Sequence, residues 1–96
     1  MTFMSLVKEI KMTRKPYVEG GLCWIPLDSS NVTAVTYDDE QQLLQVKFHT
    51  GSVYEYYDVP RTTYNNLLKA KSAGKYLNKH IRDKFDNQEV FSGTIS

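Results

Sequence analysis

Two alternating segments on either side of Gly51 constrain the fold of this chain more than any other feature. In LLQVKFH, residues 43–49, every second residue is apolar. This period of two is typical of a strand with one buried face. The segment VYEYYDV, residues 53–59, provides a second run of β-forming residues, and the TGS between the two predicts a turn. We therefore expect an antiparallel hairpin at the centre of the chain.

The length of the hairpin loop decides which residues face each other. A two-residue loop, 50–51, would set Glu55 opposite Val46 and place a carboxylate on the apolar side. A three-residue loop removes this conflict.

Two three-residue loops are compatible with the sequence. A loop of residues 50–52 pairs Phe48 with Tyr54, and a loop of residues 49–51, with Gly51 in the left-handed conformation, also groups Tyr54 with the apolar side. In both cases Tyr56 shares that side, because it lies two residues beyond Tyr54. Tyr57 is expected on the opposite face.

The flanking segments supply one more strand and two helices. Residues 32–37, VTAVTY, are rich in β-branched residues, and DDEQQ after them predicts a turn. Pro60 suits the first position of a helix over residues 61–70. A second helix follows, with apolar residues at helical spacing: Leu77, Ile81 and Phe85. Three strands followed by two helices predict an α+β fold, in which both helices cover one side of a small antiparallel sheet.

The two ends of the chain are harder to interpret. Residues 1–27 are broken by Pro16, Gly20-Gly21 and Pro26, and they form either a helix or strands added to the sheet. Residues 87–96 carry few order signals and are expected to be a polar tail.

Composition limits the classes of function. The single cysteine excludes a disulfide framework and a cysteine-based zinc site, and it fits a reducing compartment. No apolar run is long enough to span a bilayer, so we expect a cytoplasmic protein without membrane partners. His49 and His80 are isolated, which argues against a metal site. No nucleophile–base pair is evident, so we expect neither an enzyme nor a cofactor.

Charge is distributed unevenly although the net charge is only +1. Residues 37–58 contain five acids and one lysine, whereas residues 61–84 contain seven basic residues and one acid. In the second helix Lys75, Lys79 and Arg82 fall on one face. This basic stripe predicts either an anion-binding surface or an ordinary solvated helix face.

The start of that helix carries the other candidate binding residues. A Ser-x-Gly turn formed by Ser72 and Gly74 offers backbone N–H groups to an anion. Arg82 suits phosphate, Asn78 suits a base edge, and the exposed ring of Tyr57 suits base stacking. Tyr54 and Tyr56 are expected to be core residues first and additional binding residues second. In the alternative interpretation, Ser72 is only a cap, and Asn78 and Arg82 brace the sheet.

Many residues in order resemble the pattern of the KTSC family, a domain of about sixty residues named after the C-terminus of some lysyl-tRNA synthetases. The central Y-x-Y is 54–56, and the other matching residues are Ser29-Ser30, Tyr37-Asp38, Leu44, Val46, Phe48, Gly51, Val59-Pro60, Tyr64, Leu68, Ala70, Ser72, Gly74, Tyr76, Asn78, Ile81-Arg82 and Phe85. The resemblance places the domain at residues 28–86. It implies a binding module with RNA as its suspected ligand, which also occurs as a stand-alone bacterial or phage protein.

These features together predict a non-enzymatic module for a nucleotide-type ligand. The ligand is either single-stranded RNA or a small nucleotide signal sequestered by a phage-type sponge. A pI of about 7.8 is low for a general nucleic-acid binder, which favours the small ligand. We also expect a homo-oligomer. The alternative function is a protein-interaction or homo-oligomerisation module without a nucleotide.

Overall fold

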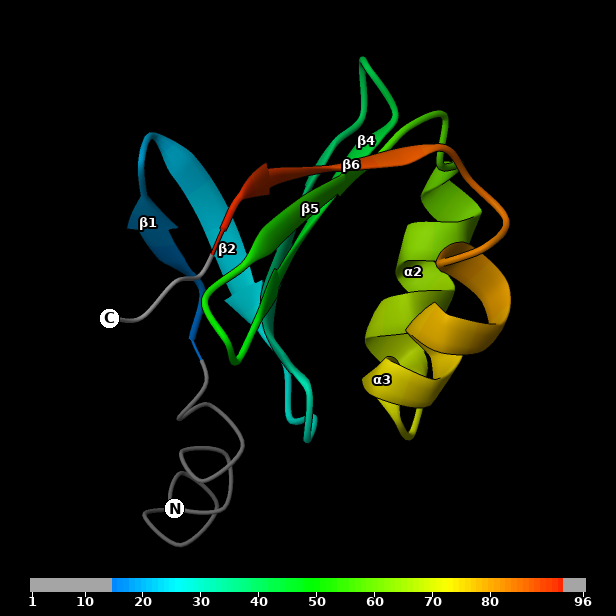
Figure 1. Cartoon of the computed structure of the whole chain (residues 1–96), viewed down its shortest axis with the longest axis horizontal. Helices are drawn as coiled ribbons and strands as arrows, with labels where there is room; N and C mark the ends of the chain where they lie inside the picture. Colours follow the sequence, from blue (N-terminus) through cyan, green and yellow to red (C-terminus); the bar gives the residue numbers. More distant parts are fainter. Residues whose placement is uncertain (1–14, 93–96) are drawn as a thin grey trace, which may run out of the picture.

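The computed structural model describes residues 15–92, and within them it shows an antiparallel sheet of six strands and a short helical region. The elements in chain order are β1 (Tyr17–Glu19), β2 (Leu22–Pro26), β3 (Val32–Asp38), β4 (Leu43–Phe48), β5 (Val53–Tyr56), α2 (Arg61–Lys69), α3 (Ala73–Tyr76), the π-helical segment η1 (Leu77–Ile81) and β6 (Asn87–Phe91). The strands are ordered β1 to β6 across the sheet, each antiparallel to the next. Both helices cover one face of the sheet (Figure 1), which confirms the predicted α+β fold.

The β4–β5 hairpin has the three-residue loop 49–51. Leu44 pairs with Tyr56 and Val46 with Tyr54, which confirms the predicted alternative 49–51 and shows that the alternative 50–52 is wrong. Gly51 has a φ of 96°, a conformation that residues with a Cβ rarely adopt. Its N–H donates to the carbonyl oxygen of Phe48 at 2.8 Å and closes the turn.

The core lies between the sheet and the helices. Alternation on β4 and β5 places Leu44, Val46 and Tyr56 on the helix side, each with at most 2% of its surface exposed. The helical region covers them with buried side chains: Tyr64, Leu67, Ala73, Leu77 and Ile81. Phe85 packs against this cluster, so the predicted apolar stripe of the second helix is confirmed.

The ends of the described chain extend the sheet on both sides. β1 and β2 show that the N-terminal extension adds strands, whereas the alternative helix around residues 6–12 lies outside the described residues. The prediction that residues 87–96 form a polar tail is wrong for Asn87–Phe91, which form β6 and pair with β5. Every residue of β6 is exposed, so the strand lacks the alternation of buried and exposed residues from which a strand is predicted.

The face of the sheet opposite the helices is partly covered by the β1–β2 hairpin. Trp24 is only 4% exposed, and the Lys47 ammonium lies 4.6 Å from the centre of its ring. Lys47 also contacts Glu19 of β1. Burial by itself would lower the pKa of Lys47, but its hydrogen bonds to Glu19 and Tyr17, together with their charges, raise it overall.

Within residues 15–92, no helix has the length and apolar character needed to cross a bilayer.

Candidate functional site

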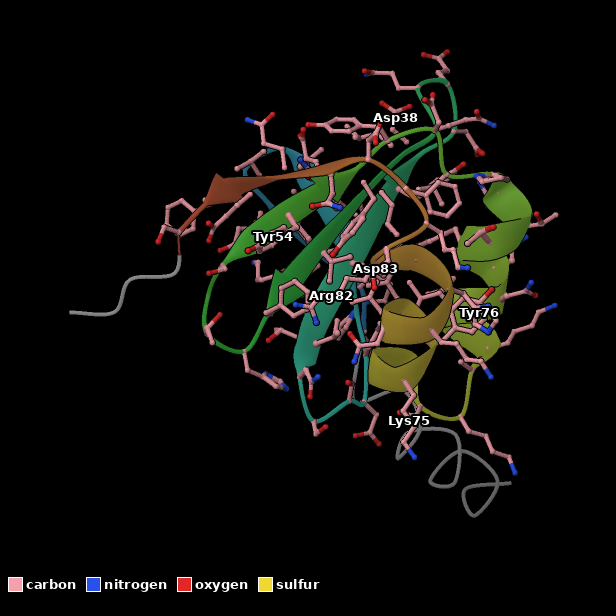
Figure 2. The ribbon with its side chains drawn as sticks, turned by 45° about the vertical axis from the view of Figure 1, so that its right-hand side comes forward. Asp38, Tyr54, Lys75, Tyr76, Arg82 and Asp83 are labelled. Atoms are coloured by element: carbon pink, nitrogen blue, oxygen red, sulfur yellow. The ribbon has the colours of Figure 1, made fainter. Side chains whose placement is uncertain are left out.

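A pocket of about 560 Å³ lies between the helical region and the β4–β5 hairpin. The sheet contributes Phe48, Tyr54 and Tyr56, and the helical region contributes Asn78, Arg82 and Asp83. The loop before β3, the hairpin loop and the first residue of β6 complete the wall. Figure 2 shows Arg82 and Asp83 between the helical ribbon and the strand that carries Tyr54.

The floor of the pocket is aromatic. Tyr54 and Tyr56 lie on the same side of β5 with ring centres 6.5 Å apart, and Phe48 meets Tyr54 edge-on at 5.7 Å. Tyr56 is 2% exposed, and its hydroxyl forms no hydrogen bond to any residue in 15–92. Its burial raises the pKa of Tyr56, although the positive charge of Arg82 opposes this shift. Tyr56 is therefore a neutral phenol at the pocket wall, available to donate or accept a hydrogen bond.

The helical wall is shaped by η1. The N–H of Arg82 donates to the carbonyl oxygen of Leu77 at 2.8 Å, five residues back, which is the hydrogen bond of a π-helix. Asn78 and Arg82 both line the pocket, and the Arg82 guanidinium donates to Asn78 Oδ1 at 3.2 Å. Within the described residues, Arg82 has no ion pair with Asp38 or Asp58, so bracing of the sheet by these pairs is not observed.

Asn87 and Asp83 are among the pocket residues that the sequence did not identify as site residues. Asn87, at the start of β6, donates through Nδ2 to the carbonyl oxygens of Arg82 at 3.3 Å and Phe85 at 3.1 Å. Asp83 adds a carboxylate next to Arg82. Asn87 belongs to a segment assigned to the tail, and Asp83 is one acid among seven bases, so no local sequence signal marks either residue.

His49 is also part of the pocket wall, at the tip of the β4–β5 hairpin. Its Nε2 lies 2.8 Å from the carbonyl oxygen of Ser29, and its Nδ1 lies 2.8 Å from the hydroxyl of Thr33. A carbonyl only accepts, so Nε2 carries the proton, and Nδ1 accepts from Thr33 when the ring is neutral. His49 therefore ties the hairpin tip to the loop before β3. In the part of the chain that the structure describes, no cluster of His, Cys, Asp or Glu could hold a metal ion.

Four of the predicted site residues thus converge on the pocket: Tyr54, Tyr56, Asn78 and Arg82. The other five do not line it: Tyr57, Ser72, Gly74, Lys75 and Lys79.

Ser72 and Gly74 instead hold the helical region in place. Ser72 caps α3, because its Oγ accepts from the N–H of Lys75 at 3.3 Å. Gly74 is buried, and a Cβ at this position would lie 3.2 Å from Ser29 Oγ. The Ser-x-Gly turn therefore packs against the loop before β3.

The lysines and Tyr57 lie elsewhere. Figure 2 shows Lys75 at the opposite end of the helical region from Arg82, and Lys79 is exposed. The basic stripe is split because a π-helical turn holds one residue more than an α-helical turn and rotates the residues that follow. The hydroxyl of Tyr57 donates to Glu55 at 3.0 Å on the other face. Burial and this bond raise the pKa of Tyr57.

A second hollow, of about 580 Å³, lies between β2, β3 and the start of α2. It contains the stacked rings of Tyr37 and Tyr64, with centres 4.7 Å apart. Its cation, Arg61, already forms an ion pair with Asp39. The first pocket has an arginine without a carboxylate partner in residues 15–92 and is the better candidate for an anionic ligand.

Comparison with known proteins places this domain in a family. A family model for the KTSC domain matches residues 28–85. The chain belongs to the KTSC family. This confirms the resemblance, and every pocket residue except Asn87 lies within the KTSC match.

Relatives of this KTSC protein are small bacterial proteins and parts of larger ones. It is 37% identical over 60 residues to a protein of Tsukamurella paurometabola, a match that covers 62% of this chain and 90% of the relative. A lysine–tRNA ligase of Nostoc punctiforme is 35% identical over 63 residues, which are 66% of this chain but only 11% of the ligase. The crystal structure of a KTSC domain protein from Yersinia pestis superposes with a TM-score of 0.68 and 27% identity, covering 70% of this chain and 94% of that one.

Proposed function

We propose that this KTSC protein binds a small nucleotide-type ligand in the pocket between η1 and the β4–β5 hairpin, without catalysing a reaction. The observation that carries the proposal is the buried ring of Tyr56, whose hydroxyl lacks a hydrogen-bond partner in residues 15–92 and borders the same pocket as Arg82. Among the described residues, no buried side-chain nitrogen or oxygen atom lacks a partner, so this unbonded hydroxyl is open to the pocket rather than sealed in the core. A ligand oxygen would satisfy Tyr56 and Arg82 together.

The composition of the pocket supports a nucleotide rather than a purely apolar ligand. Its volume of about 560 Å³ falls within the range of ligand pockets. Phe48 and Tyr54 provide aromatic surface for a base, and Arg82 provides charge-assisted donors for a phosphate. Tight holding without turnover is the property that a sequestering protein requires, so the predicted sponge role remains part of this proposal.

Retention of nucleotides by native mass spectrometry tests the proposal. The purified protein is incubated with a nucleotide extract of bacterial cells, desalted, and compared under native and denaturing conditions. We expect a bound mass that is released as a nucleotide on denaturation. The variant Arg82→Ala should lose it, because the phosphate then has no cation in the pocket.

The matched control for Arg82→Ala is Lys79→Ala. It removes the same charge from the same helical region at an exposed position outside the pocket, so retention should not change. Equal retention by Arg82→Ala and wild type, or no retained nucleotide from the extract, would contradict the proposal.

Single-stranded RNA is the second candidate ligand. It is supported by the match to part of a lysine–tRNA ligase, a protein named for tRNA, and by exposed lysines outside the pocket, Lys75 and Lys79. In this case a Lys75→Ala, Lys79→Ala double variant should weaken RNA binding and reduce its dependence on salt. A small ligand in the pocket should be insensitive to both changes. Homo-oligomerisation and a cytoplasmic location stay predictions.

A further inference from the structure

Asn78 presents a hydrogen-bond donor to the pocket. Its Oδ1 accepts from the Arg82 guanidinium at 3.2 Å. A guanidinium only donates, so this contact fixes which end of the Asn78 amide is the oxygen. The Nδ2 group has no partner among residues 15–92. It therefore stands beside Arg82 as a second donor, and the Tyr56 hydroxyl is a third.

Asn87 presents the opposite polarity. Both of its Nδ2 hydrogens are directed at carbonyl oxygens, at 3.3 Å on Arg82 and 3.1 Å on Phe85. Carbonyls only accept, so the free end of this amide is Oδ1. Asp83 also lines the pocket, and its carboxylate has no hydrogen bond or ion pair within the described residues. Asn87 and Asp83 are therefore two acceptors without donors.

On the helical wall, the donor Asn78 and the acceptor Asp83 lie at different positions along the chain. Asn78 is in the first turn of η1, whereas Asp83 lies two residues beyond its last residue, Ile81. Four residues lie between them. Arg82 reaches back toward Asn78, and Asn87 is held at the C-terminal end by its bond to the Arg82 carbonyl.

The charge of the pocket limits the charge of its ligand. Arg82 is its cation and Asp83 its anion among the described lining residues, while both ring nitrogens of His49 are engaged by Ser29 and Thr33. Lys75 and Lys79 do not line the pocket. One phosphate opposite Arg82 is matched by this arrangement, whereas a triphosphate would bring several unpaired negative charges close to Asp83.

We infer, on the basis of the proposed function, that the ligand is a nucleotide with a single phosphate group and an exocyclic amino group on its base. The phosphate accepts from Arg82, Asn78 Nδ2 and the Tyr56 hydroxyl. The amino group, which has two hydrogens to donate, bonds to Asn87 Oδ1 and the Asp83 carboxylate. Adenine, cytosine and guanine carry such a group, whereas hypoxanthine and uracil have none.

Two matched pairs of nucleotides test this inference by calorimetry. AMP and IMP differ by an amino group against a carbonyl oxygen, and CMP and UMP differ in the same way. We expect AMP or CMP to bind at least about tenfold more tightly than its partner. In IMP or UMP the carbonyl oxygen of the base would face Asn87 Oδ1 and the Asp83 carboxylate, and none of these three groups can donate a hydrogen bond. ATP should bind more weakly than AMP.

The variants Asp83→Ala and Asp86→Ala test whether Asp83 causes the preference for the amino form of the base. Asp83→Ala should reduce the preference for the amino form, whereas Asp86→Ala removes an exposed acid from the same loop outside the pocket and should leave it unchanged. Equal binding of both members of a pair would overturn the amino-group inference and leave the proposed function standing. Tighter binding of ATP than of AMP would overturn the single-phosphate part. Binding of none of the five nucleotides would overturn the inference, and retention from the cell extract would then decide the proposed function separately.

Discussion

Gly74 shows how one absent side chain sets the position of a whole helix. A Cβ at residue 74 would meet Ser29 Oγ at 3.2 Å and Asn31 Nδ2 at 3.5 Å. The Ser29 hydroxyl cannot move freely, because it accepts from the backbone N–H groups of Asn31 and Val32 at 3.2 and 3.3 Å. The missing Cβ therefore allows α3 to pack closely on the loop before β3, which is also part of the pocket wall.

We expect Gly74→Val to lower the free energy of unfolding by about 1–3 kcal/mol through overpacking against Ser29. Urea denaturation followed by circular dichroism measures this change. The control Lys75→Val introduces the same side chain at the next position, which is exposed, and should cost less than about 1 kcal/mol. Equal losses for the two variants would mean that the contact with Ser29 is not the cause.

At the scale of elements, the β1–β2 hairpin is joined to the rest of the sheet by a small number of contacts. β2 pairs with β3 through Ile25 with Val35 and Pro26 with Ala34. Trp24 adds a buried ring beneath the Lys47 ammonium, and its indole N–H donates to the carbonyl oxygen of Glu19 at 3.3 Å. Burial of this ring accounts for the attachment of the hairpin better than the short strand pairing does.

Replacing Trp24 by Ala should therefore destabilise the hairpin strongly, by about 3 kcal/mol or more, because a large buried ring is removed. Hydrogen exchange should show the amides of β1 and β2 losing protection before those of β4. The matched control is Val18→Ala in the same hairpin, where the side chain is 74% exposed and the expected change is within about 0.5 kcal/mol. Uniform loss of protection across all strands would show that the hairpin does not open separately.

At the scale of the whole molecule, several tyrosines couple stability to alkaline pH. Burial raises the pKa of Tyr37, Tyr56 and Tyr64 above the ordinary value of 10.0. The folded state therefore favours the neutral phenol. This contribution is fully present below the unfolded pKa, near 10, and is lost as the pH rises through the higher pKa of the folded protein.

We expect the free energy of unfolding to fall as the pH rises from about 9 to about 11, with a smaller decrease in Tyr56→Phe, which has one fewer buried phenol to ionise. Denaturation midpoints at both pH values provide the measurement. Tyr76→Phe removes a hydroxyl from a half-buried ring outside this group and is the control. The same slope in Tyr56→Phe and wild type would rule out a contribution from Tyr56.

From the sequence alone it was possible to predict the central hairpin, the shared face of Tyr54 and Tyr56, the apolar stripe of the second helix and the family. These features depend on periodicity over a few neighbouring residues, where the backbone geometry dictates which side chains share a face. It also identified Asn78 and Arg82 as candidate binding residues. It left the position of the three-residue loop open, because Gly51 fits a loop of residues 49–51 as well as one of residues 50–52.

Which candidate residues lie together in the pocket follows from the three-dimensional packing of the domain. The π-helical turn of η1 separates Arg82 from Lys75 and Lys79, although all three lie on one face of an ideal α-helix. β6 pairs with β5 through backbone hydrogen bonds, which leave no pattern in the side chains of residues 87–91. That pairing brings Asn87 to the pocket. Contacts between segments far apart in the chain depend on the packing of the whole domain, so a local reading of the sequence does not contain them.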